Sequence, residues 1–131
     1  MRVDNNLDKN RDGIFYWTKH SQEKLRQYGL SASRIKRLIR HPERIEAGIA
    51  PETWASMQTA GSKKHPYEIW TMYVVEKARL RGQAKKQSIK IISAWKYPGK
   101  TNPGDPVPIP PDIFEEIIQD LLVKQNDKRR V

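Results

Sequence analysis

The sequence contains no cysteine among its 131 residues. This absence excludes disulfide scaffolds, cysteine-ligated zinc or iron–sulfur sites and thiol catalysis, and it favours a cytoplasmic protein. The amino-terminal residues have no apolar signal-peptide core, and no apolar run approaches the roughly 18 residues that cross a bilayer. We therefore expect a soluble chain without a membrane partner. Neither zinc-type spacing of the histidines nor a phosphate-binding or dinucleotide fingerprint is present, so we expect no metal and no cofactor.

Acidic residues are missing from residues 77–102, which carry eight lysines and arginines. A second basic block, Thr18–Pro42, holds seven bases and one acid, and the rest of the chain is nearly neutral or acidic, so that the formal net charge is +10. Both blocks contain regularly spaced apolar residues, which indicates folded basic surfaces for an anionic partner. The block at 77–102 has an alternative role. Its lysines would then bind no partner and would only prevent edge-to-edge association of strands.

The first half of the chain predicts a strand, two helices and a hairpin. Ser21 is a good N-cap for the first helix and Gly29 ends it, while Ser31 or Ser33 caps the second helix and Pro42 ends it. The apolar period then changes from 3.6 to 2, as is typical of strands. The expected elements are a strand at 14–17, a helix at 22–28, a helix between Ser31 and Pro42, and paired strands at 45–49 and 53–59.

The second half predicts two long strands, a connector and a helix. Residues 67–78 are apolar at odd and even positions, as in a strand covered on both faces, and 87–95 is its expected antiparallel partner. Residues 98–111 contain six prolines and two glycines and predict an extended connector. Asp112 and Glu115 stand at capping-box spacing before an amphipathic helix at 112–124.

These elements predict a single α+β domain with the order β-α-α-β-β-β-β-α. We expect an antiparallel sheet of four to five strands with the two amino-terminal helices on one face, a core over residues 14–97 and a flexible segment at 1–13. The carboxy-terminal helix is expected to close the core. Its acidic face leaves two alternatives open, which are docking on a partner chain and folding back on the basic surface.

Proton transfer near neutral pH has few candidates here, because only three histidines are present. His20 lies in the segment Lys19-His-Ser-Gln-Glu-Lys-Leu-Arg-Gln-Tyr-Gly-Leu-Ser31, which a helix, His41-Pro42 and the closing Ile91-Ile-Ser-Ala-Trp-Lys-Tyr97 follow. This pattern resembles that of a family of small domains of unknown function related to BrnT-type toxins, within the RelE/ParE-like toxin superfamily. The resemblance covers about residues 15–98. Lys24 and Tyr28 depart from the arginines that are usual at these two positions.

The resemblance implies a basic, nuclease-like fold that binds RNA. The toxins of this superfamily cleave mRNA without a metal. In such cleavage His20 would act as base or acid, Arg26 and Lys96 would clamp the phosphate, and Tyr97 or Trp95 would stack on a base. An acidic antitoxin-like protein would be a further partner. The expected nucleic-acid contacts are Lys19, Lys24, Arg34, Arg37, Lys64, His65, Arg79, Arg81, Lys85 and Lys86.

Alternatives stand beside these roles. A histidine at a helix start often satisfies a local backbone group, and the tryptophans more often fill the core than stack on bases. The leading hypothesis is a toxin-like RNA-binding protein and candidate metal-independent ribonuclease. The competing hypothesis is a non-catalytic module that binds nucleic acid or an acidic protein through the two basic blocks.

Overall fold

The strands and helices follow one another in the predicted order. The computed structural model describes residues 14–78 and 86–129. The predicted flexible segment 1–13 and the predicted contacts Arg79, Arg81 and Lys85 lie outside the described residues. The elements are β1 (Ile14–Trp17), α2 (Lys19–Tyr28), α3 (Ala32–Arg40), β2 (Arg44–Ala47), β3 (Thr53–Gly61), β4 (Pro66–Ala78), β5 (Lys86–Pro98) and α4 (Pro111–Arg129).

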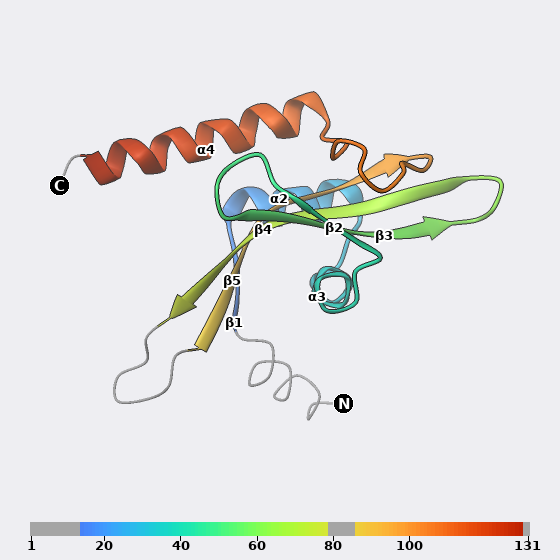
Figure 1. Cartoon of the computed structure of the whole chain (residues 1–131), viewed down its shortest axis with the longest axis horizontal. Helices are drawn as coiled ribbons and strands as arrows, with labels where there is room; N and C mark the ends of the chain where they lie inside the picture. The colour runs from blue at the N-terminus through green and yellow to red at the C-terminus, as the bar shows by residue number, and fades with distance from the viewer. Residues whose placement is uncertain (1–13, 79–85, 130–131) are drawn as a thin grey trace.

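The strands form one five-stranded sheet in the order β1-β5-β4-β3-β2. The predicted β2–β3 and β4–β5 pairs are confirmed as antiparallel, as is the pair of β3 with β4. Strand β1 differs from the expected pattern because it runs parallel to β5. Helix α3 lies on one side of the sheet and α4 on the other (Figure 1).

Helix α2 begins earlier than the sequence predicts. Thr18, rather than Ser21, is the N-cap, because its Oγ1 accepts a hydrogen bond of 3.0 Å from the backbone N–H of Ser21. The Thr18 hydroxyl also donates to the carbonyl of Ile91 at 3.1 Å, which ties the start of α2 to β5. His20 therefore lies in the first helical turn. Gly29 ends α2 in the left-handed conformation at φ 67°, as predicted.

Two apolar clusters cover the two faces of the sheet. The α3 face buries Leu25, Ile35, Leu38 and Ile69, with α2 packed against β5 and α3 against β3 and β4. The opposite face, called here the α4 face, is covered by α4 and by the proline-rich connector. Ile113 and Ile117 of α4 are completely buried there, so the first turns of this helix close the core. Pro111 opens α4 and the helix runs to Arg129, beyond the predicted end at residue 124.

A bulge in β5 changes which side chains face α3. Met72 pairs with Ser93 and Tyr73 with Ile91, so Ile92 is an extra residue. Before the bulge, Ile89 and Ile91 contribute to the α3-face cluster; after it, even-numbered positions do so, beginning with Ala94. Strict alternation from Ile89 would place Lys96 on the α4 face, and the bulge places it on the α3 face.

No helix in the described part of the chain is long and apolar enough to cross a membrane.

Candidate nucleic-acid interface

A basic pocket of about 260 Å³ opens on the α3 face, where the loop between α2 and α3 meets the ends of two strands. We call it the α3 pocket. Its cations come from distant parts of the sequence, since Arg34 and Arg37 belong to α3 and Lys96 to β5. The pocket is lined by Gly29, Leu30, Ser31, Arg34, Arg37, Tyr67, Ile69 and Lys96.

The local structure explains why these side chains converge. Ser31 caps α3, because its hydroxyl accepts a hydrogen bond of 3.0 Å from the backbone N–H of Arg34. The α3 N-terminus thus lies at the pocket, where helix N–H groups favour an anion. Arg34 and Arg37 follow at a spacing of three residues and share one side of the helix. Lys96 enters from the sheet, and its Nζ lies 5.3 Å from the centre of the Tyr67 ring.

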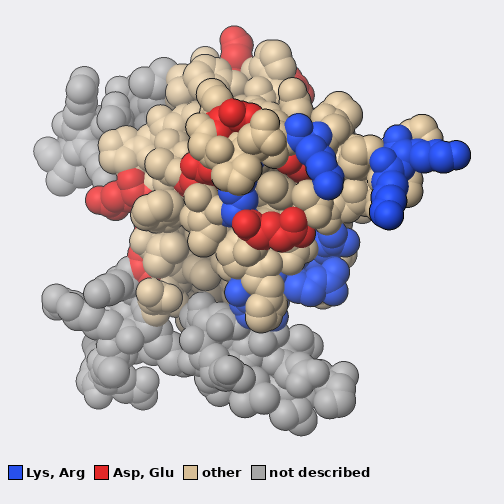
Figure 2. All heavy atoms as spheres, turned by 45° about the vertical axis from the view of Figure 1, so that its right-hand side comes forward, with Lys and Arg blue, Asp and Glu red and all other residues tan. Residues whose placement is uncertain are grey.

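The positive charge of the α3 pocket is not neutralised within the described residues. No carboxylate among them forms an ion pair with Arg34, Arg37 or Lys96, and the Nε atom of Arg34 is buried without a hydrogen-bond partner there. Figure 2 shows lysine and arginine side chains gathered at the right of the view, toward the end of the sheet where β3 turns into β4. A buried cationic donor is costly until a partner satisfies it. The arrangement is suited to binding a phosphate or another oxyanion.

His20 lies elsewhere, between β5 and α4. Its Nε2 is 3.1 Å from the hydroxyl oxygen of Ser93, and its Nδ1 is 3.6 Å from the Oε1 of Glu116. The order Ser-His-Glu is that of a nucleophile, a base and an orienting acid. Ser93, however, is completely buried and the His20 side chain is only 11% exposed. In this arrangement no substrate atom reaches the hydroxyl, and the three side chains connect α2, β5 and α4.

Lys24, a predicted nucleic-acid contact, likewise forms its contacts with α4. Its Nζ lies 3.1 Å from Glu116 and 3.5 Å from Asp112, and it donates to the Gln27 side chain at 2.9 Å. Burial alone lowers the pKa of Lys24, but the hydrogen bonds and negative charges of Glu116 and Asp112 outweigh it and raise the pKa above its ordinary value. Burial, and then the negative charge of Asp112, raise the pKa of Tyr28 nearby. This lysine stabilises the contact between α2 and α4.

The structure separates the predicted catalytic residues. Lys96 lines the α3 pocket, whereas Tyr97 packs half-buried against the α4-face cluster. Arg26 is exposed in the last turn of α2, outside the lining of the α3 pocket. Lys96 and Tyr97 therefore lie on opposite faces of the sheet, because adjacent strand residues point to opposite faces.

The predicted nucleic-acid contacts divide in a similar way. Arg34 and Arg37 meet Lys96 in the α3 pocket. Lys64 and His65 are exposed in the turn between β3 and β4, and Lys19 is exposed at the start of α2. The side chain of Lys86, at the start of β5, is not among those described. Sequence reasoning missed Tyr67, since its place beside Lys96 depends on the strand register.

No protein-family model, curated protein or solved structure matches this chain. The fold and the site define it as an α+β protein with a basic pocket that no described carboxylate neutralises. The resemblance to BrnT- and RelE-type toxins stays a hypothesis. Among the described residues, no three histidine, aspartate or glutamate side chains gather closely enough to hold a metal ion.

Proposed function

We propose that the protein binds RNA and that the α3 pocket holds a phosphate of the RNA backbone. The observation that supports this most directly is the convergence of Arg34, Arg37 and Lys96 without a paired carboxylate among the described residues. One guanidinium group can donate two parallel hydrogen bonds to two oxygens of a phosphate, and a lysine adds a positive point charge. RNA is the favoured nucleic acid because of the resemblance to BrnT- and RelE-type toxins.

The pocket favours binding over chemistry. Cleavage at a 2′-hydroxyl needs a group that removes its proton, usually a histidine or a carboxylate. Neither residue type contributes a described side chain to the α3 pocket, and His20 lies on the other side of β5 in contact with Ser93. Metal-independent RNA cleavage is therefore the second candidate, and it would use His20 only if the contact between α2 and α4 opens.

Fluorescence anisotropy with a labelled single-stranded RNA, in a buffer with EDTA, tests the binding proposal. We expect Arg37→Gln combined with Lys96→Gln to weaken binding about tenfold and to reduce the steepness of its salt dependence by about 0.7 for each lost phosphate contact. Lys36→Gln combined with Lys90→Gln is the matched control that also removes two charges. Lys36 belongs to α3, but its ammonium lies 5.4 Å from the centre of the Phe15 ring, and neither lysine lines the pocket. Equal effects of the pocket and control variants would contradict the proposal.

The same samples, run on a denaturing gel, test the second candidate. Intact RNA after incubation with the wild-type protein supports a binding protein without ribonuclease activity. RNA that the wild type shortens and His20→Ala leaves intact would instead identify a ribonuclease. A DNA strand of the same sequence shows whether the 2′-hydroxyl contributes to binding.

Any antitoxin-like partner would compete for the same pocket. Carboxylates are the ligands that arginine forks bind as readily as phosphates. We infer that an acidic protein segment placed in the α3 pocket would displace RNA. Adding increasing amounts of a polyglutamate peptide to the labelled complex measures this competition.

A further inference from the structure

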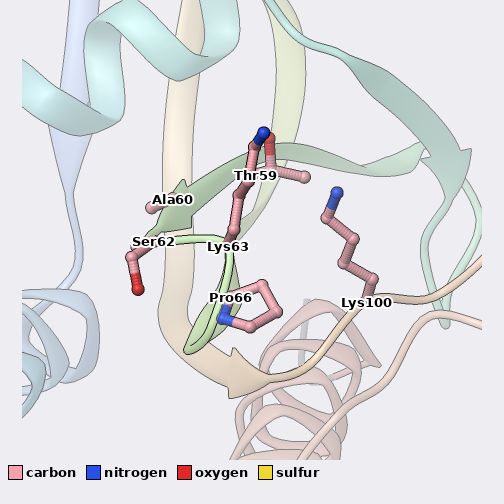
Figure 3. A pocket seen from close by; sticks show the side chains of 7 residues that line it. Thr59, Ala60, Ser62, Lys63, Pro66 and Lys100 are labelled. Carbon is pink, nitrogen blue, oxygen red and sulfur yellow. The ribbon is translucent and has the colours of Figure 1, made fainter.

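A second basic pocket, of about 370 Å³, lies at the same end of the sheet. We call it the hairpin pocket, because residues of the β3–β4 hairpin form most of its wall. Met57 of β3 belongs to the α4-face cluster, and alternation places Thr59 and Gly61 on that same face. The pocket is lined by Thr59, Ala60, Gly61, Ser62, Lys63, Pro66 and Lys100 (Figure 3).

Two lysines from separate segments supply the charge of the hairpin pocket. Figure 3 shows Lys63, from the turn, and Lys100, from the connector, extending from the Pro66 side toward Thr59. Neither lysine forms an ion pair with a carboxylate of the described residues. The nearby carboxylate of Glu43 accepts hydrogen bonds from the backbone N–H of Thr59 at 3.0 Å and from its hydroxyl at 2.9 Å. Among the described residues, no carboxylate therefore pairs with either ammonium group in place of an external anion.

The backbone fixes the positions of these lysines. Gly61 has a φ of +84°, and a Cβ built there would lie 2.3 Å from the carbonyl oxygen of His65, so only glycine fits. The turn is closed by a hydrogen bond of 3.1 Å from the backbone N–H of His65 to the hydroxyl of Ser62. Lys100 directly precedes Thr101, whose backbone N–H donates to the completely buried Glu68 at 2.6 Å. Both lysines therefore extend from a well-anchored backbone.

The two pockets lie on opposite faces of the sheet, at the end where β3 turns into β4. Tyr67 lines the α3 pocket and its neighbour Pro66 lines the hairpin pocket, and these residues pair in the sheet with Ala60 and Gly61. The exposed turn at 62–65, which contributes Lys64 and His65, joins one face to the other. Lys64 thus lies on the turn that separates the two basic pockets.

We propose that the hairpin pocket is a second phosphate site, and that one RNA strand passes around the β3–β4 turn with one phosphate in each pocket. This inference rests on the proposed binding of RNA in the α3 pocket. Neighbouring strands lie only about 4.8 Å apart and packed layers about 10 Å apart, so the path bends sharply. Duplexes resist such bending, because their persistence length is about 150 base pairs. The ligand is therefore single-stranded where it rounds the turn.

The test compares two double variants of the full chain by anisotropy. Lys63→Gln with Lys100→Gln removes the charge of the hairpin pocket. Lys36→Gln with Lys90→Gln is the matched control, since Lys36 lies over Phe15 of β1 and Lys90 pairs with Tyr16 of β1, away from the turn. The probes are a labelled single-stranded RNA of about ten nucleotides, a dinucleotide that fills one pocket only, and an RNA duplex.

We expect the hairpin-pocket variant to bind the longer strand about tenfold more weakly than the control, with a salt slope that is smaller by about 0.7 per lost phosphate contact. The dinucleotide should bind both variants alike, and the duplex should bind the wild type more weakly than the single strand.

The outcomes separate this inference from the proposed function. If the α3-pocket variant loses affinity while the hairpin-pocket variant equals its control, the second site is wrong and RNA binding stands. If the duplex binds as tightly as the single strand, the path around the turn is wrong. If the wild type binds none of the three probes at low salt, the proposed function itself fails.

Discussion

The cations packed beneath α4 and the cations of the α3 pocket have opposite surroundings. On the α4 side, Lys24 and Arg44 are buried beside carboxylates. On the α3 face, Arg34, Arg37 and Lys96 share a pocket without a paired carboxylate among the described residues. The formal charge of +10 therefore divides into cations that stabilise the fold and cations that a ligand can reach. Net charge alone cannot make this division.

Arg44 shows most clearly how a cation is used for stability. Its Nε donates to Glu46 at 2.7 Å, another nitrogen donates to the carbonyl of Asp105 at 2.8 Å, and the guanidinium lies 5.1 Å from the centre of the Trp70 ring. It also donates to the hydroxyl of Thr101. These contacts fasten the connector to β2 and β4, beneath α4.

The largest expected effect is that of Arg44→Met on stability. The change leaves the partners of a buried arginine without their donors, so the free energy of unfolding should fall by about 2 to 3 kcal/mol. Urea denaturation measures this loss. RNA affinity of the folded variant should equal that of the wild type, and a tenfold loss of affinity at unchanged stability would break the comparison between the buried cations beneath α4 and those of the α3 pocket.

Lys24→Met is expected to have the next largest effect. The ion pairs of Lys24 involve half-exposed carboxylates, so the free energy of unfolding should fall by about 1 kcal/mol, less than for Arg44. Lys19→Met at the exposed start of α2 is the stability control and should change the free energy by less than about 0.5 kcal/mol. RNA affinity that falls strongly in Lys24→Met would show that α4 moves aside to admit RNA.

The order of elements and the basic blocks were predictable because they depend on local patterns. Apolar periodicity located the strands at 45–49 and 53–59, and a serine located the start of α3. The start of α2 was not predictable from Ser21 alone, since Thr18 occupies the cap by also bonding to β5. A contact between residues 73 positions apart leaves no mark in a local pattern.

The site was only partly predictable, for the same reason. Arg34, Arg37 and Lys96 were identified by charge and by position at element ends. Their grouping depends on the bulge at Ile92, which turns Lys96 toward α3 and leaves Tyr97 on the other face. One extra residue reverses the alternation, so counting by twos along the strand assigns the wrong face.

Tyr67→Leu tests how the sheet positions Lys96. The ring centre lies 5.3 Å from the ammonium, a contact worth about 0.5 to 1 kcal/mol at a partly exposed site. Its loss should weaken RNA binding about threefold, as measured by anisotropy. Tyr67→Phe keeps the ring and is the control. Equal losses in the two variants would assign the effect to the hydroxyl group instead.

The smallest expected effect concerns acid stability and returns to Arg44. The hydrogen bond that Arg44 donates to Glu46, together with the one from the backbone N–H of Gly104, lowers the pKa of Glu46 below the ordinary value of 4.5. The folded state therefore binds a proton at Glu46 less readily than the unfolded state does. The stability that this pair contributes is complete above the unfolded pKa and is lost as the pH falls through the folded value.

Urea denaturation at several pH values measures this dependence. The difference in the free energy of unfolding between the wild type and Glu46→Gln should be present at pH 7 and shrink toward pH 3. Arg37→Gln is the control from the α3 pocket, where no described carboxylate pairs with the cation, so its difference from the wild type should not change over that range. A constant difference for Glu46→Gln would show that the charge of its carboxylate does not stabilise Arg44.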